Sequence, residues 1–552
     1  MKQNRKTDNS FVTQAGILAA AGIISRVIGL LYRSPLSSVI GPLGLGYYNS
    51  AYAYYTIILL ISSYSIPSAI SKVIAQKLAV GEYRNAHRLF WGSLFYVLVV
   101  GAVGSLVLFF GAGLFVEDAA IPVLRVFAPT VFVYGLLGVL RGYFQAHRSM
   151  VQTSVSQILE QIANAVVSIG AAVLLIRHFC GTMEVPAEED LKISRAVYGA
   201  MGSALGTGAG VVMGLLFMFL AYRINQKDIL RRVRKDKHQN VDSYGTIVKT
   251  ITFTVTPFIL STAVYNLVNS LNTKLYTDLY PTMSGIGNVA VTEDWGIFGC
   301  SQTVSNIPIA FASAMAAAMI PSIASLVASA EIDVACEKIG IAVKTTMLIS
   351  IPCAVGLFIL SGPVMVLLFP TTADYYSLAR GTLMTLSLSV AFYAYSTLNS
   401  SILQGLGKVN TPIWNAGIAL VIQTVCALLM LKFTSLGVYS IAAANAVYSG
   451  TMALLNQRAV RKAVGYEQEM DKSFLRPFLA SLVMGLVAGG VYLLLHMVAG
   501  LSARIAVIPA ILLAVPVYFA ALLLFKTVEE EELTNLPKGR VLVRVAKKMH
   551  LL

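Results

Sequence analysis

The fold class of this 552-residue chain is decided by its residues 15–40, AGILAAAGIISRVIGLLYRSPLSSVI. The stretch is long enough to cross a bilayer as a helix, for which about 20 mostly apolar residues suffice. Two cations, Arg26 and Arg33, interrupt it. A charged side chain at membrane depth is costly, so it is expected to face protein or water and to mark a functional site. The stretch therefore predicts a spanning helix that carries part of a site.

The composition of the whole chain indicates a membrane protein. Hydrophobic residues make up 57% of it and charged residues only 12%, with a mean hydropathy of +0.73. Soluble domains carry about 25% charged residues, so this composition disfavours a soluble enzyme, a nucleic-acid-binding module and a secreted disulfide scaffold. The five cysteines lack metal-ligand spacing, and the sequence contains no nucleotide-binding or catalytic motif. We therefore expect no enzymatic activity, no metal and no cofactor.

Apolar runs of spanning length recur along the chain and predict fourteen transmembrane helices. They cover residues 15–40, 51–74, 89–116, 121–144, 151–176, 196–222, 247–271, 295–327, 341–368, 378–403, 413–431, 436–455, 478–499 and 505–525. The segments between them are too short to fold as separate catalytic domains. We therefore expect an all-α polytopic membrane protein whose function lies within the membrane.

Charge in the loops predicts the orientation of these helices, since Lys and Arg collect on the cytoplasmic side of membrane proteins. With the N-terminus inside, 29 of the 41 Lys and Arg residues, Arg141 among them, fall in inner loops and 8 in outer loops. An odd number of spans would put the C-terminal tail outside and reduce this bias. We therefore expect both termini in the cytoplasm, and the asymmetry also accounts for the net charge of +15.

Short sequence echoes indicate two halves of six helices and a final pair. SIPSA at 65–69 corresponds to NIPIA at 306–310, and YFQA at 143–146 corresponds to ILQG at 402–405, in the same order. Six is an even number, so the halves share one orientation, as in transporters with parallel repeats and a pseudo-two-fold axis along the membrane normal. The expected parts are an N-terminal six-helix lobe 1–222, a basic cytoplasmic linker 223–246, a C-terminal six-helix lobe 247–457, a second cytoplasmic linker 458–476, a helix pair 477–526 and a cytoplasmic tail 527–552.

Arg26 and Arg33 are the first candidates for a binding site. Seven residues are about two helical turns, which puts both guanidinium groups on one face of the first span, about 10 Å apart. Guanidinium groups form paired hydrogen bonds with phosphate oxygens, so this face suits an anionic ligand. Lys274, at the outer end of the seventh span, is the nearest matching cation of the second half. An interfacial position is the alternative for both Arg33 and Lys274.

Further polar residues have the spacing of shared helix faces. Those expected to line a cavity, or else to hydrogen-bond between helices, are Asn266, Asn269, Gln302, Ser305 and Asn306. Pro67 and Pro308 occupy corresponding places in the two halves. They are the expected hinges, because proline removes a helical hydrogen bond.

Glu160, in the fifth span, is the one carboxylate clearly at membrane depth. Two interpretations stay open. It pairs with a cavity arginine as a gate or ion-coupling residue, or it lies near a helix N-terminus whose dipole stabilises the charge. The scarcity of such carboxylates disfavours a cation-coupled exporter, which needs them to carry the coupling ion.

Several motifs are similar to those of a known family. They are SRVIGLLYR at 25–33, GPLGLGYYNSAY at 41–52, SIPSAISK at 65–72 and SQILEQ at 156–161. In this order on fourteen spans, they resemble bacterial polysaccharide-biosynthesis transporters of the multidrug/oligosaccharidyl-lipid/polysaccharide (MOP) exporter superfamily. The closest types are the stage V sporulation protein B group and the MurJ-like lipid II flippases. The resemblance covers essentially the whole chain.

The resemblance implies two six-helix lobes around a cationic cavity that opens alternately to the two sides of the membrane. It implies a glycan carried on undecaprenyl pyrophosphate as substrate, with Arg26 and Arg33 serving the cavity and the last two helices forming a groove for the lipid tail. Two places depart from the family pattern. Residues 302–308 lack the arginine expected before Pro308, and Asn164 stands where an arginine often follows the SQILEQ motif.

We therefore expect a flippase of the bacterial cytoplasmic membrane, with lipid II, the peptidoglycan precursor, as the leading candidate substrate. The expected partners are the lipid-linked oligosaccharide, membrane lipid and cell-wall synthesis enzymes, and no nucleic acid. Two alternatives stay open. One is a cation-coupled multidrug exporter of the same superfamily, and the other is a non-transporting scaffold for wall-synthesis enzymes.

Overall fold

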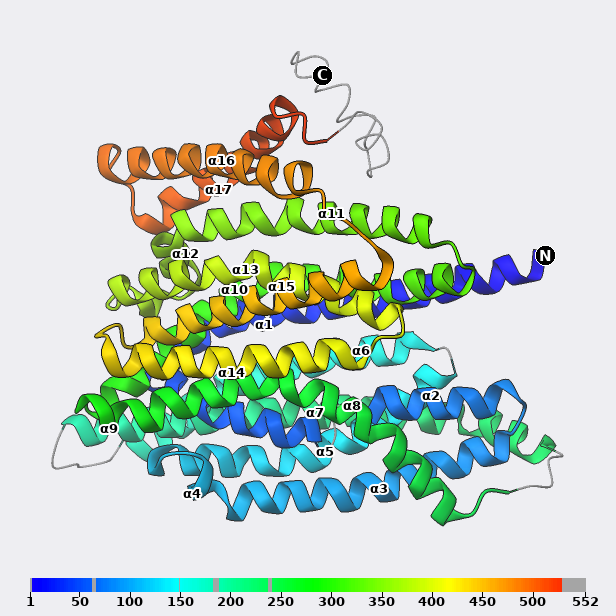
Figure 1. The fold of residues 1–552 in the computed structure, drawn as a ribbon. Helices are drawn as coiled ribbons and strands as arrows, with labels where there is room; N and C mark the ends of the chain where they lie inside the picture. The colour runs from blue at the N-terminus through cyan, green and yellow to red at the C-terminus, as the bar shows by residue number, and fades with distance from the viewer. Residues whose placement is uncertain (1, 62–65, 148, 182–187, 237–240, 529–552) are drawn as a thin grey trace. The chain divides into compact units, whose positions relative to one another are not determined.

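The fold is known from a computed structural model that describes residues 2–61, 66–147, 149–181, 188–236 and 241–528. Over these ranges the chain is a succession of long helices joined by short turns, and they contain no strand (Figure 1). The predicted all-α class is therefore confirmed for the part of the chain that is described.

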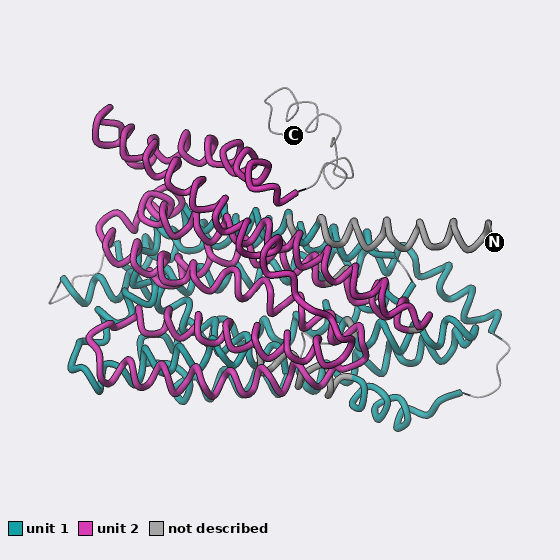
Figure 2. The backbone as a smooth tube through the Cα atoms, turned by 45° about the horizontal axis from the view of Figure 1, so that its top comes forward, with its two compact units in different colours: residues 1–296 teal, residues 297–552 magenta. Residues whose placement is uncertain are grey.

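The chain divides into two compact units, residues 1–296 and 297–552 (Figure 2). Unit 1 contains α1 (Lys2–Leu59), α2 (Ile66–Ala79), α3 (Tyr83–Phe110), α4 (Ala112–Phe115), η2 (Asp118–Ala120), α5 (Ile121–Ala146), α6 (Met150–Cys180), α7 (Glu188–Lys235), α8 (Tyr244–Thr273), η3 (Lys274–Leu279), α9 (Tyr280–Ser284) and the beginning of α10 (Asn288–Ala328). The division thus falls inside α10, between Gly296 and Ile297. The lobe ranges expected from the repeats concern internal homology and stay a prediction.

Unit 2 begins with the rest of α10. It continues with α11 (Ile332–Ile359), α12 (Ser361–Leu368), η4 (Pro370–Thr372), α13 (Tyr376–Gly405), α14 (Asn410–Phe433), α15 (Val438–Val464), η5 (Asp471–Leu475), α16 (Arg476–Leu493), η6 (Leu494–Val498) and α17 (Ala503–Leu524). The α16–α17 pair packs on α11, where the Tyr518 hydroxyl donates a hydrogen bond to the Leu348 carbonyl at 2.8 Å.

Among the described residues, nine helices are long and apolar enough to cross a membrane. They carry the third to sixth, the ninth and the eleventh to fourteenth of the predicted spans. The remaining five predicted spans also lie on helices, namely α1, α1 with α2, α8, α10 and α13, apart from residues 62–65, which lie outside the described residues. A multi-pass helical membrane protein is confirmed, and the count of fourteen stays a prediction.

The first predicted span ends where the sequence placed its end. The continuous helix α1 is two helices joined at Gly41, whose backbone has φ 68° and ψ 175°. Glycine adopts positive φ readily because it has no Cβ. Pro42 follows, and its fixed φ suits the first turn of the next helix. The Gly41-Pro42 pair therefore separates Arg26 and Arg33 from the tyrosine-rich helix that follows.

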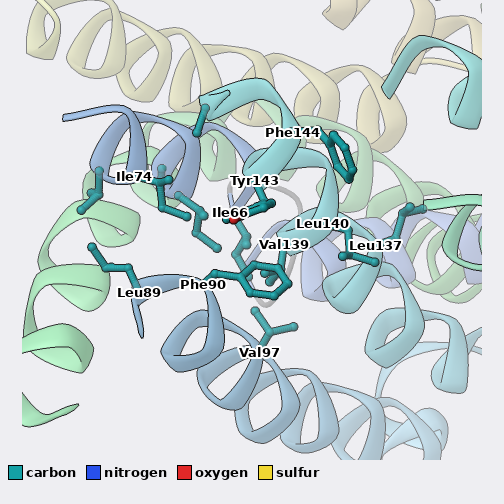
Figure 3. Close-up of a cluster of buried hydrophobic side chains, with 14 of the residues drawn as sticks. Ile66, Ile74, Leu89, Phe90, Val97, Leu137, Val139, Leu140, Tyr143 and Phe144 are labelled. Carbon is teal, nitrogen blue, oxygen red and sulfur yellow. The ribbon is translucent and has the colours of Figure 1, made fainter. Parts of the chain in front are cut away.

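Close helix approach holds the core of unit 1. Glycines 202, 206 and 210 of α7 face α6, and a Cβ at Gly206 would overlap Ser168. Small residues at such an interface let two backbones pack tightly. A second cluster of buried side chains joins α2, α3, α5, α7 and α8, with Ile66, Phe90 and Tyr143 pointing toward one another (Figure 3). These contacts hold α5, α6 and α7 in place around the buried polar residues described below.

The linker after α7 is fixed to the turn between α2 and α3. Helix α7 continues past the end of the sixth predicted span, and Asp236 directly after it is buried. The backbone N–H of Arg84, in the first turn of α3, donates a hydrogen bond to Asp236 Oδ2 at 2.7 Å. Lys77 Nζ lies 2.9 Å from Asp242 Oδ2. A carboxylate from a distant segment thus stabilises the N-terminus of α3.

Candidate functional site

Arg26 and Arg33 occupy different environments on α1. The side chain of Arg26 is exposed, whereas Arg33 is half-buried beside the hydroxyls of Tyr32, Tyr48 and Tyr52. The Arg33 guanidinium donates a hydrogen bond to Tyr32. Of the two cations predicted for the site, Arg33 is therefore the one whose side chain has tyrosine hydroxyls of unit 1 around it.

The tyrosines around Arg33 are tied to α6 and α7. The Asn164 amide donates a hydrogen bond to the Tyr32 hydroxyl at 3.2 Å, and Ser168 Oγ donates to Asn164 Oδ1 at 2.8 Å. The Tyr48 hydroxyl lies 3.2 Å from Thr207 Oγ1. Sequence analysis noted Asn164 only as a departure from a family motif and missed the tyrosines. The signal for Tyr48 and Tyr52 is the concentration of tyrosine in residues 47–55, and the signal for Tyr32 is its place directly before Arg33.

Glu160 pairs with Arg141. The Arg141 Nη2 to Glu160 Oε2 distance is 2.7 Å, and Arg141 Nε donates a hydrogen bond to Ser156 Oγ at 2.9 Å. Arg141 is only 5% exposed and the Glu160 side chain 16%. Gly214 of α7 faces the guanidinium, since a Cβ there would lie 3.5 Å from Nη2. This contact joins α5 to α6 inside unit 1.

The assignment of Arg141 to an inner loop was wrong. It lies within α5 and is buried against α6. The signal was available, because residue 141 falls inside the predicted span 121–144. Of the two interpretations of Glu160, the structure shows pairing with an arginine, although neither Arg26 nor Arg33 is its partner. Its role as a gate or ion-coupling residue stays a prediction.

Unit 2 contains a neutral contact near ILQG, the segment predicted to correspond to YFQA. Asn415 Nδ2 donates to Asn456 Oδ1 at 2.8 Å, and Asn456 Nδ2 donates to Ser400 Oγ at 2.8 Å. Ser400 stands two residues before ILQG, just as Arg141 stands two residues before YFQA. An amide network therefore joins α13, α14 and α15 in unit 2, and an ion pair joins α5 and α6 in unit 1.

The other predicted site residues have mixed surroundings. The Lys274 side chain is 57% exposed and its Nζ lies 3.7 Å from Asp278 Oδ2, so its role in a cavity or at the interface stays a prediction. Asn266, Asn269 and Gln302 are partly buried, Ser305 is buried and Asn306 is exposed. The first two belong to unit 1 and the last three to unit 2. Their common cavity wall stays a prediction.

The two prolines proposed as hinges differ in their local structure. Pro67 is the second residue of α2, where its missing N–H is not needed. Its backbone packs on Gly142, where a Cβ would lie 2.7 Å from the Pro67 carbonyl oxygen. Pro308 is buried within α10. Hinge motion at either position stays a prediction.

A group of carboxylates at the beginning of α10 was not predicted. Thr292 Oγ1 donates a hydrogen bond to Glu117 Oε1 at 3.0 Å, and burial raises the pKa of Glu117 to about 7, with the Asp278 carboxylate adding to the effect. Burial also raises the pKa of Asp294, against the opposing effect of the hydrogen bond it accepts from Tyr276. These contacts join the ends of separate apolar segments, and sequence alone gives no sign of them.

Comparison with known proteins identifies the family. The family model described as polysaccharide biosynthesis protein matches residues 11–327. The chain belongs to the polysaccharide biosynthesis protein family. A second model, MatE, matches residues 283–429. Together these matches confirm the resemblance to the MOP superfamily.

Curated relatives of this polysaccharide biosynthesis protein come from Bacillus subtilis (strain 168). Lipid II flippase MurJ is 23% identical over 431 residues, which cover 75% of this chain and 76% of MurJ. Stage V sporulation protein B is 22% identical over 543 residues, covering 97% of this chain and 99% of that protein. Among solved structures, lipid II flippase MurJ in an inward closed conformation has a TM-score of 0.63 at 14% identity, covering 93% of this chain and 97% of that one. The chain is a MurJ-like transporter of the MOP superfamily by family and by fold.

Proposed function

We propose that this protein is a flippase that moves an undecaprenyl-pyrophosphate-linked glycan, with lipid II as the first candidate, across the cytoplasmic membrane. The observation that carries the proposal is Arg33, a cation held within a predicted span by tyrosine hydroxyls, with Arg26 two turns earlier on the same helix. Guanidinium groups bind phosphate oxygens through paired, charge-assisted hydrogen bonds. A pyrophosphate offers oxygens to both arginines.

The physical need for such a protein supports the proposal. A glycan head group cannot cross hydrocarbon alone, because each unsatisfied polar group there costs several kcal/mol. A cavity that opens alternately to the two sides lets the head group cross inside protein while the prenyl tail stays in lipid. The relative named lipid II flippase MurJ supports the same substrate class.

The roles within the proposal follow the sequence prediction. Arg26 and Arg33, with Lys274 as the cation of the second half, bind the pyrophosphate. Glu160 acts as gate or ion-coupling residue through its contact with Arg141. The remaining assignments are a polar cavity wall of Asn266, Asn269, Gln302, Ser305 and Asn306, hinges at Pro67 and Pro308, a lipid-tail groove at α16 and α17, both termini in the cytoplasm, and cell-wall synthesis enzymes as partners.

The experiment is to measure lipid II on the outer face of bacteria that are depleted of their own flippases and express this chain. Restored exposure that is lost in Arg33→Ala and in Arg26→Ala supports the proposal. Arg177→Ala, which removes an exposed arginine from the last turn of α6, is the matched control and should leave exposure unchanged. Wild-type exposure in both site variants, or none from a well-expressed wild type, would contradict it.

A cation-coupled multidrug exporter is the second candidate, favoured by the MatE match over residues 283–429 and by a carboxylate at depth, Glu160. The two candidates differ in the charge of the substrate, which is positive for the exporter and negative for the flippase. An exporter of cationic drugs should raise resistance to such drugs and lose this effect in Glu160→Gln, while Arg33→Ala retains it. A flippase should show the opposite dependence on Arg33.

A further inference from the structure

We infer that Tyr32 and Asn164 are positioning residues that fix the orientation of the Arg33 guanidinium for an anionic ligand. The inference deepens the proposed function and rests on it, because it takes Arg33 to bind the pyrophosphate. It adds two residues to the site, both reached through hydrogen bonds that connect three helices.

The first step is the hydrogen bonding of Tyr32. Its side chain is 9% exposed, and its hydroxyl accepts hydrogen bonds from the Arg33 guanidinium and from Asn164 Nδ2, the latter at 3.2 Å. A tyrosine hydroxyl can donate one proton as well as accept hydrogen bonds. Because Arg33 and Asn164 both donate to the Tyr32 oxygen, the Tyr32 proton is available to an acceptor. An anion bound by Arg33 is the acceptor that we assign to it.

The second step is the orientation of Asn164. An amide can present either its oxygen or its nitrogen to a neighbour, and the hydrogen-bond network decides which. Ser168 Oγ donates to Asn164 Oδ1 at 2.8 Å, so the Asn164 nitrogen points toward Tyr32. Asn164 is 8% exposed and Ser168 is fully buried. Both are therefore held away from solvent that could compete for these hydrogen bonds.

The third step is the attachment of this network to α7. Ser168 Oγ lies 3.2 Å from the Ser203 carbonyl oxygen, and it sits against Gly206, where a Cβ would overlap it. Tyr48, the second tyrosine beside Arg33, is connected to α7 through Thr207 at 3.2 Å. Helix α7 is thus connected to the hydrogen bonds of Arg33 through Ser168 and Asn164 of α6, and it separately holds Tyr48, whose hydroxyl lies near Arg33.

The consequence concerns the selection of the ligand. A planar guanidinium recognises paired phosphate oxygens only in a limited set of orientations, unlike an ammonium group. Fixing that plane beside the Tyr32 hydroxyl presents neighbouring N–H and O–H donors together, which favours an anion with several oxygens, such as a phosphate group. Asn164 therefore positions Tyr32, and it does so at the place where the family pattern often has an arginine.

The test measures binding of undecaprenyl pyrophosphate and of undecaprenyl monophosphate to the full-length protein in detergent. We expect Tyr32→Phe to weaken binding of the pyrophosphate about ten-fold, the usual effect of losing a hydrogen bond to a charged group, and to weaken binding of the monophosphate in the same direction. Asn164→Leu should act in the same direction. Tyr54→Phe is the matched control, because the buried Tyr54 hydroxyl has no hydrogen-bond partner among the described residues, and its binding should be unchanged.

A double-mutant cycle separates positioning from general damage to the fold. In an Arg33→Ala background, Tyr32→Phe should have no further effect on binding, because the group that it positions is gone. Ser168→Ala disturbs the same series of hydrogen bonds and replaces Asn164→Leu as the test variant if Asn164→Leu does not fold. Additive effects of Arg33→Ala and Tyr32→Phe, or unchanged binding in Tyr32→Phe and Ser168→Ala, would overturn the inference. Unchanged binding in Arg33→Ala would instead overturn the role of Arg33 in the proposed function.

Discussion

The guanidinium of Arg141 and the carboxylate of Glu160 lie 2.7 Å apart inside unit 1, on two helices that follow one another in the chain. Neither charge is open to solvent enough to be hydrated as in water, so each depends on the other. A buried ion pair stabilises a fold little compared with apolar side chains, but removal of one partner leaves an uncompensated buried charge. The pair is therefore sensitive to single substitutions and tolerant of a matched double substitution.

Glu160→Ala should lower the free energy of unfolding by about 3–5 kcal/mol, because it leaves the Arg141 guanidinium unpaired. Arg141→Met combined with Glu160→Leu should recover most of this loss. Thermal unfolding in detergent measures both effects, with the exposed Arg177→Ala as control. A double variant that is stable and still restores lipid II exposure would exclude a gating role for the pair.

Glu117 should make stability depend on pH. Its folded pKa of about 7 lies above the ordinary value of 4.5, so the folded state binds this proton more tightly than the unfolded state. The resulting stabilisation is fully present below about pH 4.5 and is lost as the pH rises through 7. It amounts to about 3 kcal/mol.

The measurement for Glu117 is the unfolding free energy between pH 5 and pH 8. The wild type should lose more stability over this range than Glu117→Gln, which keeps a neutral side chain of the same size. Asp118→Asn removes the neighbouring exposed acid and should retain the pH dependence of the wild type. Equal slopes for wild type and Glu117→Gln would show that Glu117 titrates at its ordinary value.

Gly206→Ala should destabilise the contact between α6 and α7. The added methyl group would overlap Ser168, and overpacking of this kind costs about 1–3 kcal/mol. Gly170→Ala on α6 is the matched control, because a Cβ at Gly170 meets no atom within 4 Å. A thermal midpoint that falls for the first variant and not for the second would confirm close approach of the two helices. Equal thermal midpoints for the two variants would show that the α6–α7 interface accommodates the added methyl group without loss of stability.

Asp236→Ala should loosen the first turn of α3. It removes the carboxylate that accepts the Arg84 N–H at 2.7 Å, and loss of a helix-capping group costs about 0.5–2 kcal/mol. Hydrogen–deuterium exchange should accelerate at the amides of residues 83–86 while the middle of α3 keeps its protection. Asp228→Ala, on the exposed face of α7, serves as control. Unaltered exchange at residues 83–86 would contradict the capping role.

Local features of this fold could be read from the sequence. Span ends such as Gly41-Pro42 depend on the backbone preferences of one or two residues, and apolar length alone indicates a helix. Arg26 and Arg33 stood out because a charge in an apolar run is rare. These inferences need only residues that are near one another in the chain.

The partners of the site residues could not be predicted in the same way. Tyr32 meets Asn164 across 132 positions, and Glu117 meets Thr292 across 175. Such contacts depend on how the helices pack, which the hydrophobic pattern leaves open. Arg141 could be predicted only in part. The apolar pattern placed it inside the fourth span, but the count of loop charges assigned it to an inner loop.

Two buried polar contacts, one in each unit, differ in how a membrane potential acts on them. In unit 1 opposite charges make the contact, Arg141 of α5 and Glu160 of α6, whereas in unit 2 the neutral amides of Asn415 on α14 and Asn456 on α15 make it. Moving one full charge through the membrane field changes the energy by about 2.3 kcal/mol per 100 mV. Separation of the first contact displaces charges in that field, and separation of the second displaces only dipoles. A membrane potential therefore acts on separation of the Arg141–Glu160 contact far more strongly than on separation of the Asn415–Asn456 contact.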